Sequence, residues 1–239
     1  MKAATNASDG RDLHARTTVL ITGFGPFPGV PVNATMRLVP ELVHAAARVF
    51  PGVRITTAIL ATEWLAAPQR LDHLLAEVRP DLALHFGVSG RARGFEIETR
   101  ACNRCAASPD ASGALPPAGT VREGGAGHLG AGLPVRYLVA RLRRRGIPAF
   151  VSRDAGEYLC NATLYHALLR AREAPGRRVG FIHVPATLVR PGGDNRGRSG
   201  ACALTWAQAV DGGLDILAGC LGRHGSALGE RLVRRRPRR

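Results

Sequence analysis

Cys160 is the side chain of this sequence best placed for nucleophilic chemistry. Ala149–Ser152 is predicted to be a strand, and after a short turn Glu157–Arg172 has the apolar pattern of a helix, so Cys160 is expected in the first helical turn. Unpaired backbone N–H groups and the helix dipole stabilise an anion there, which favours a thiolate and offers donors to a tetrahedral oxyanion. A small buried residue on the core face of the helix would explain the same position.

His183 is a candidate general base for this thiol. Val179–His183 is predicted to be a buried strand, and the carboxyl ends of strands in open α/β sheets face the ligand crevice. A histidine there can act as the base of a Cys–His pair, or it can simply be hydrogen-bonded at the end of a strand. Three other histidines lie within helical patterns and are expected to be structural, namely His44, His73 and His166.

Glu96 and Glu98 form an acidic pair in the segment FEIETRACN. Two residues apart on an extended segment, their side chains point the same way. One carboxylate could orient the imidazole and stabilise its protonated form, as the third member of a catalytic triad does. The alternative is an exposed strand face whose carboxylates pair with nearby arginines at positions 91, 93 and 100.

A Gly- and Pro-rich loop, Gly23–Asn33, follows the first predicted strand. It carries Phe24 and Phe27, whose rings on a stiff loop at the ligand crevice would suit a small, flat, uncharged group. The two rings could equally anchor the loop in the core. Asn33 is expected to cap the helix that follows.

Two other patterns are set aside. Cys102 and Cys105 have the C-x-x-C spacing, but there is no second pair and no helix start after a strand, so neither zinc binding nor redox use is expected. The segment GVSGRARG is not a G-x-G-x-x-G loop, and no phosphate-binding loop is predicted. No metal site is expected.

Apolar runs alternate with helical patterns along the chain, which predicts an α/β fold: a single-domain three-layer α/β/α sandwich with a mostly parallel, twisted central sheet. The predicted strands are Thr18–Thr22, Val53–Leu60, Asp81–Phe86, Ala149–Ser152 and Val179–His183. The predicted helices are Thr35–Phe50, Pro68–Val78, Pro134–Arg145, Glu157–Arg172 and Ala201–Leu221. Residues 107–133 have no clear period and are expected to form a loop.

The net charge of +15 on 239 residues would ordinarily suggest a nucleic-acid or anionic-membrane partner. All but one of the 33 basic residues are arginine, which indicates a coding bias more than a phosphate-binding surface. Part of the charge is concentrated in residues 223–239, which are expected to be a solvated Arg-rich tail. Aromatic residues make up only 5%, with no basic-aromatic pattern for base stacking, so nucleic-acid binding is not the expected function.

The termini divide the chain into a disordered extension at 1–17, one α/β domain at 18–222 and the tail at 223–239. No apolar run near the start resembles a secretory signal, and no segment is long and apolar enough to span a membrane. Five cysteines, an odd number, without an export signal predict reduced thiols in the cytoplasm.

From about Val19 to Leu221 the chain resembles the pyroglutamyl-peptidase I family of cysteine peptidases, also called pyrrolidone-carboxylate peptidases. Five segments carry the resemblance: LITGFGPFPGVPVN, HFGVSGRARGFEIETRACN, GLPVRYLVARLRRRGIPAFVS, SRDAGEYLCNATLYHAL and FIHVP. The last two, which resemble the nucleophile helix and the histidine strand of the family, are the most specific.

The resemblance implies a cysteine exopeptidase that removes N-terminal pyroglutamate without a metal or cofactor, and a homo-oligomer, because members of the family often form dimers or tetramers. It assigns the nucleophile to Cys160, the acid and base to His183, and the triad carboxylate to Glu98. It assigns substrate binding to four further residues, namely Phe24, Phe27, Asn33 and Val88. Glu96 falls where the family does not place a carboxylate.

The sequence departs from the family pattern within residues 99–112 and at Arg153–Asp154, where the family has Asn-Thr. Segments that help to line the site are affected, so two alternatives remain beside pyroglutamyl hydrolysis. The same fold and thiol could act on another small N-acyl or cyclic amide. A protein of a different class, a basic nucleic-acid binder, would use the charge itself.

Overall fold

A computed structural model describes residues 17–192 and 202–222. The N-terminal extension and the Arg-rich tail expected from the sequence therefore lie outside the described residues, apart from Thr17, and the boundaries of the domain stay a prediction. Within the described part, no helix combines the length and the apolar character needed to cross a membrane.

In the part of the chain that the structure describes, six strands form the central sheet in the order β2-β1-β3-β8-β4-β7. Their bounds are β1 Thr18–Phe24, β2 Arg54–Leu60, β3 Leu82–Ser89, β4 Phe95–Glu98, β7 Ala149–Ser152 and β8 Arg178–Pro185. Neighbouring strands are parallel except for β4 and β8, which pair antiparallel. The sheet is therefore mixed but mostly parallel, and the predicted fold class is confirmed. A separate two-stranded sheet pairs β5, Arg100–Cys102, with β6, His128–Gly130.

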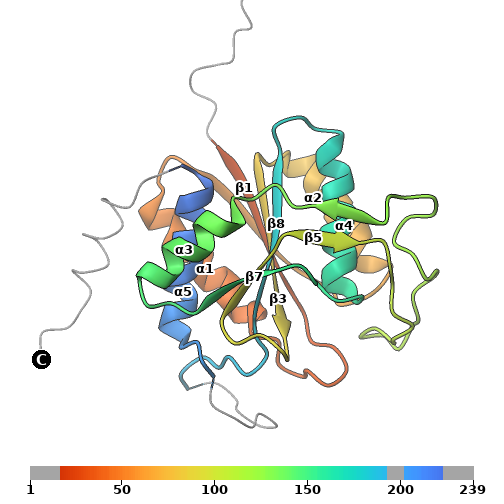
Figure 1. The fold of residues 1–239 in the computed structure, drawn as a ribbon, viewed down its shortest axis with the longest axis horizontal. Coiled ribbons are helices and arrows are strands. Elements are labelled where there is room, and N and C mark those ends of the chain that lie inside the picture. The colour runs from red at the N-terminus through yellow and green to blue at the C-terminus, as the bar shows by residue number, and fades with distance from the viewer. Residues whose placement is uncertain (1–16, 193–201, 223–239) are drawn as a thin grey trace, which may run out of the picture.

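Within the described residues, five helices cover the two faces of the large sheet (Figure 1). On one face α1, α3 and α5 share a core with the sheet, and on the other face α2 and α4 do so. Their bounds are α1 Thr35–Val49, α2 Ala66–Val78, α3 Val135–Arg144, α4 Leu159–Arg172 and α5 Trp206–Cys220. Strands β1, β3 and β8 lie between both layers, which is why they read as nearly continuous apolar runs in the sequence.

Three strands were not predicted, and every helix except α1 starts one to five residues from its predicted position. Strands β4 and β5 are short, and β6 lies inside the segment 107–133 that was expected to be all loop. Helix α5 begins at Trp206 and not at Ala201, because Thr205 caps it: its hydroxyl accepts a bond from the Gln208 N–H, and the Gln208 side chain reciprocates. Helix α4 begins at Leu159, two residues later than predicted.

Candidate active site

Cys160 is the second residue of α4, after Tyr158, whose extended backbone ends the preceding loop. No side chain caps this helix start, so the N–H groups of the first turn remain available to a ligand. Gly87 on β3 leaves room for the thiol, because a Cβ atom at Gly87 would lie 3.0 Å from Cys160 Sγ and 2.8 Å from Phe181 Cζ. The sulfur therefore lies directly against the backbone of the central sheet.

His183 lies beside this position. It is paired in register with Gly87 across β3 and β8, and Gly87 is the residue against which the Cys160 sulfur packs. The His183 side chain is almost fully buried, with 5% of the residue exposed. Burial alone would lower the pKa of His183, but attraction to and hydrogen bonding with Cys160 and Glu98 raise it to about 10. At neutral pH the imidazole is therefore protonated next to the sulfur.

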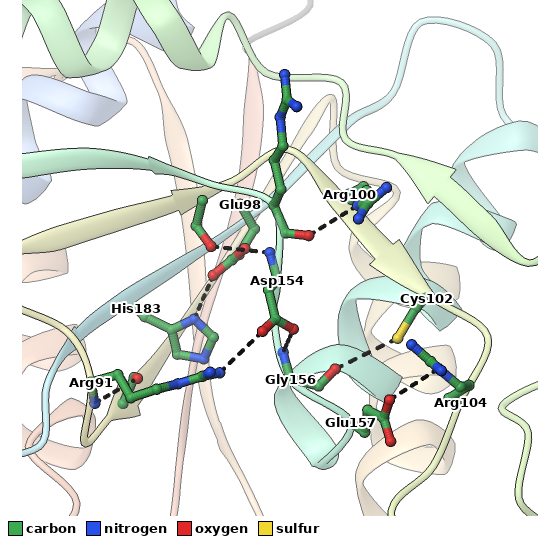
Figure 2. A network of polar contacts seen from close by, with 12 residues as sticks. Arg91, Glu98, Arg100, Cys102, Arg104, Asp154, Gly156, Glu157 and His183 are labelled. Carbon is green, nitrogen blue, oxygen red and sulfur yellow. Dashed lines mark hydrogen bonds and ion pairs between the residues drawn. The ribbon is translucent and has the colours of Figure 1, made fainter.

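Glu98 holds the other side of the imidazole. Its Oε1 atom lies 2.8 Å from His183 Nδ1, and the residue has no exposed surface (Figure 2). Because β4 runs antiparallel to β8, the carboxylate at the end of β4 reaches back to a residue near the end of β8. Among the described residues, the second oxygen of Glu98 is buried without a hydrogen-bond partner. A buried carboxylate bonded to Nδ1 leaves Nε2 for proton transfer.

A cavity of about 430 Å³ opens over these residues. Apolar and aromatic side chains line much of it, among them those of Phe24, Phe27, Val88 and Tyr158. Phe24 and Val88 are buried, with 2% and 7% exposed, whereas Phe27 is only half-buried. Phe24 also packs on Phe181 and so serves the core and the cavity together.

Tyr158 was not identified from the sequence, although it stands two residues before the candidate nucleophile. Its ring contacts Phe27, with centroids 5.8 Å apart, and meets Trp64 edge-on at 5.2 Å. Its hydroxyl donates a 3.1 Å hydrogen bond to the Pro109 carbonyl. Burial and the nearby charges of Asp110 and Cys160 raise the pKa of Tyr158 to about 12, so the ring wall is uncharged. Thr62, also missed, lines the same cavity.

Asn33 lies in the cavity wall, but its side chain is committed to the loop. Its amide nitrogen donates to the Gly25 carbonyl at 3.0 Å, and its oxygen accepts from the N–H and the hydroxyl of Thr35. The N-cap position of α1 is assigned to Ala34, one residue after the predicted Asn33. The Asn33 oxygen nevertheless accepts a hydrogen bond from the N–H of Thr35, the first residue of α1, so the expected capping bond is present.

The cavity rim carries an ion pair between two loops. Arg91 lies 3.3 Å from the Asp154 carboxylate, and Asp154 also accepts a hydrogen bond from the N–H of Gly156 in the turn before α4 (Figure 2). Both side chains of the pair are largely exposed, so the pair contributes little to stability. It ties the segment after β3 to the segment that leads to Cys160.

Among the described residues, one group of His, Cys, Asp and Glu side chains is close enough to hold a metal ion, namely Glu96, Glu98 and His183. Glu98 and His183 are already hydrogen-bonded to each other, so the arrangement fits a carboxylate–imidazole pair better than a set of metal ligands. The sequence predicted no metal site.

Comparison with known proteins places this arrangement in a family. A sequence profile described as pyroglutamyl peptidase matches residues 17–210. The chain belongs to the pyroglutamyl peptidase family. The resemblance predicted from the sequence segments is thereby confirmed, and the family is one of cysteine peptidases.

Members of the family with curated names are similar over most of their length. A pyrrolidone-carboxylate peptidase of Clavibacter michiganensis is 35% identical over 180 residues, 75% of this chain and 83% of the relative. One of Chromobacterium violaceum is 37% identical over 169 residues, 70% of this chain and 77% of the relative. The crystal structure of Bacillus amyloliquefaciens pyroglutamyl peptidase I superposes with a TM-score of 0.75 at 25% identity, covering 86% of this chain and 97% of that one.

The structure brings together the seven residues to which the family resemblance assigned roles. Cys160, His183 and Glu98 meet at one end of the sheet, and the four residues named for substrate binding line the cavity above them. Glu96, the carboxylate outside the family pattern, lies beside the same imidazole. The segment of residues 99–112, where the sequence departs from the family, reaches the site through the Tyr158–Pro109 hydrogen bond.

Proposed function

We propose that this chain is a cysteine exopeptidase that hydrolyses the amide bond after an N-terminal pyroglutamyl residue. The observation that carries the proposal is the placement of Cys160 against His183, with Glu98 behind the imidazole, beneath an apolar aromatic cavity. Curated relatives are named pyrrolidone-carboxylate peptidases, which supports the substrate. The proposed substrates are small peptides whose N-terminus is blocked as pyroglutamate.

The cavity suits the pyroglutamyl ring because that ring has neither a free amine nor a free acid. A neutral lactam needs apolar surface and backbone hydrogen-bonding groups, and no counter-ion. Phe24, Phe27 and Tyr158 supply the surface, and the backbone around Val88 supplies groups for the lactam amide. In this proposal Asn33 acts through the shape of its loop, since its side chain is bonded within that loop.

The reaction proceeds in two steps. The Cys160 thiolate attacks the carbonyl carbon of the pyroglutamyl residue, and the N–H groups at the start of α4 hold the oxyanion. Protonated His183 gives its proton to the leaving amine as the C–N bond breaks, which leaves a thioester on Cys160. Neutral His183 then takes a proton from water, hydroxide is added to the thioester, and pyroglutamate leaves as the thiolate is restored.

A hydrolysis assay tests this function. Wild-type protein is expected to release the fluorophore from a pyroglutamyl aminocoumarin amide, and Cys160→Ala is expected to lose this activity. Cys202→Ala, which removes a thiol packed at the edge of the other core, is the matched control and is expected to keep it. Equal turnover by wild type and Cys160→Ala would refute the proposal.

A second substrate class, another small N-acyl or cyclic amide, is favoured by one observation. Pro109, in the segment that departs from the family, positions the Tyr158 ring through its carbonyl. A changed segment there could reshape the cavity wall. Comparing kcat/KM for pyroglutamyl, prolyl and N-acetylalanyl aminocoumarin amides decides between the two classes, since only the first proposal requires the pyroglutamyl substrate to be preferred.

We further propose that the enzyme works in the cytoplasm as a homo-oligomer. All five cysteines, each in the described residues, are free thiols, which supports a reducing compartment. Light scattering of the purified chain tests the oligomer, and a monomer at micromolar concentration would refute it. Nucleic-acid binding, the remaining alternative, predicts a steep salt dependence of DNA or RNA binding that truncation at residue 222 would flatten.

A further inference from the structure

A second carboxylate lies next to the candidate catalytic histidine. Glu96 on β4 is directly opposite His183 in the antiparallel pairing of β4 with β8. One oxygen of Glu96, one oxygen of Glu98 and one ring nitrogen of His183 all lie within 4.8 Å of one another. Since alternate residues of a strand share a face, both carboxylates of β4 approach the same imidazole.

Glu96 and Glu98 differ in their surroundings. Glu98 is fully buried and hydrogen-bonded to Nδ1, so it fixes the orientation of the ring. Glu96 is half-buried. It therefore adds negative charge close to the ring, while the tautomer is already set by Glu98.

The charged groups around Glu96 come from every neighbouring segment. Glu98 lies on its own strand, His183 on β8, Arg91 on the loop between β3 and β4, and Asp154 on the loop before α4. Burial raises the pKa of Glu96, opposed mainly by His183; Glu98 and Asp154 also raise it and Arg91 lowers it.

We propose that Glu96 is a second positioning carboxylate for His183, whose negative charge keeps the imidazole protonated beside Cys160 and so extends activity to alkaline pH. The proposal rests on the proposed function for its catalytic consequence, since protonated His183 is the acid that releases the amine. A negative charge about 5 Å from an imidazolium in a partly buried site stabilises the charged ring substantially more than it would in water.

Removing the charge without changing the shape of the side chain gives the test. In Glu96→Gln, the NMR titration of the His183 imidazole is expected to move to lower pH by about one unit. The signal is assigned by its loss in His183→Gln. In a pyroglutamyl aminocoumarin assay, the alkaline limb of kcat/KM is expected to move by the same amount. That shift lowers kcat/KM about 10-fold on the alkaline side of the profile and less than about 2-fold at pH 7.

Three further variants separate charge from structure. Glu96→Asp restores the charge at a slightly greater distance and is expected to give an intermediate shift. Glu96→Ser is a second neutral variant. If Glu96→Gln disturbs folding, Glu96→Ser tests whether the charge of Glu96 affects the titration of His183. Glu157→Gln removes a carboxylate that pairs with Arg104, outside the His183 cluster, and is expected to leave the titration unchanged.

The NMR titration tests the role of Glu96, and the hydrolysis assay of the wild type tests the proposed function, so either proposal can be refuted without the other. A His183 titration that is unchanged in Glu96→Gln and Glu96→Ser overturns the role of Glu96, whatever the substrate is. A wild-type protein that does not cleave pyroglutamyl amides overturns the proposed function, while the NMR titration still decides whether Glu96 acts on His183.

Discussion

His183 Nδ1 and Glu98 Oε1 are 2.8 Å apart, although 85 residues separate them in the sequence. The contact depends on β4, a four-residue strand that pairs antiparallel with β8. Both residues of this hydrogen bond are buried, so water cannot take the place of the Glu98 carboxylate. Whatever reaction occurs at Cys160, the tautomer of His183 is set by this one hydrogen bond.

Glu98→Gln is therefore expected to reduce kcat far more than it raises KM. The amide keeps the size of the side chain but removes the charge, and it can donate to Nδ1 and so turn the ring into the wrong tautomer. A loss of about 100-fold or more in kcat on a pyroglutamyl aminocoumarin amide is expected, by analogy with the triad carboxylate of serine proteases. Glu63→Gln, on the segment after β2, is the control. A loss confined to KM would contradict the role.

The parts of this site differ in how far the sequence could predict them. Strands β1, β3 and β8 were predictable because helices cover both of their faces, so each is a nearly continuous apolar run. Strand β4 was not predicted as a strand because it has only four residues, although its sequence FEIE alternates apolar and acidic side chains. Its acidic pair was nevertheless found, since period-two spacing places both carboxylates on one face.

Contacts between distant segments were out of reach. The wall formed by Tyr158 depends on Phe27, Trp64 and Pro109, which come from three other segments, and no local pattern links them. The polar pair of Thr22 and His85 inside adjacent strands was likewise missed, because the surrounding sequence is apolar and the two residues lie 63 positions apart. Local patterns predicted the strands and the nucleophile helix, and three-dimensional packing decided what surrounds them.

Replacing Tyr158 tests its part in substrate binding. Tyr158→Ala removes a ring that lines the cavity and packs on Phe27 and Trp64, so KM is expected to rise about 10-fold or more, as a large buried ring contact is lost. Tyr158→Phe loses only the hydrogen bond to Pro109 and is expected to change KM by about 3-fold at most. The measurement is steady-state kinetics on the pyroglutamyl amide. Equal KM values for Tyr158→Ala and wild type would exclude the ring from the binding site.

His85 gives the protein a pH-dependent stability that is independent of catalysis. Its ring is fully buried, with the centroid of the Phe181 ring 6.4 Å away. It shares one hydrogen bond of 2.7 Å with the Thr22 hydroxyl, and burial lowers its pKa to about 4. Between pH 6.5 and 4 the unfolded chain binds a proton at this position and the folded chain does not. The free energy of unfolding therefore falls as pH falls through this window, by about 3 kcal/mol in total, and the contribution is constant above pH 6.5.

Urea unfolding of wild type and His85→Gln at pH 4, 5, 6 and 7 measures this effect. The glutamine variant cannot take up the proton, so its free energy of unfolding is expected to fall less steeply toward acid than that of wild type, even though it starts lower at pH 7. His128→Gln, at an exposed position on β6, is expected to retain the wild-type slope. Parallel pH dependences for wild type and His85→Gln would show that the acid sensitivity arises elsewhere, because every other titrating group is common to both proteins.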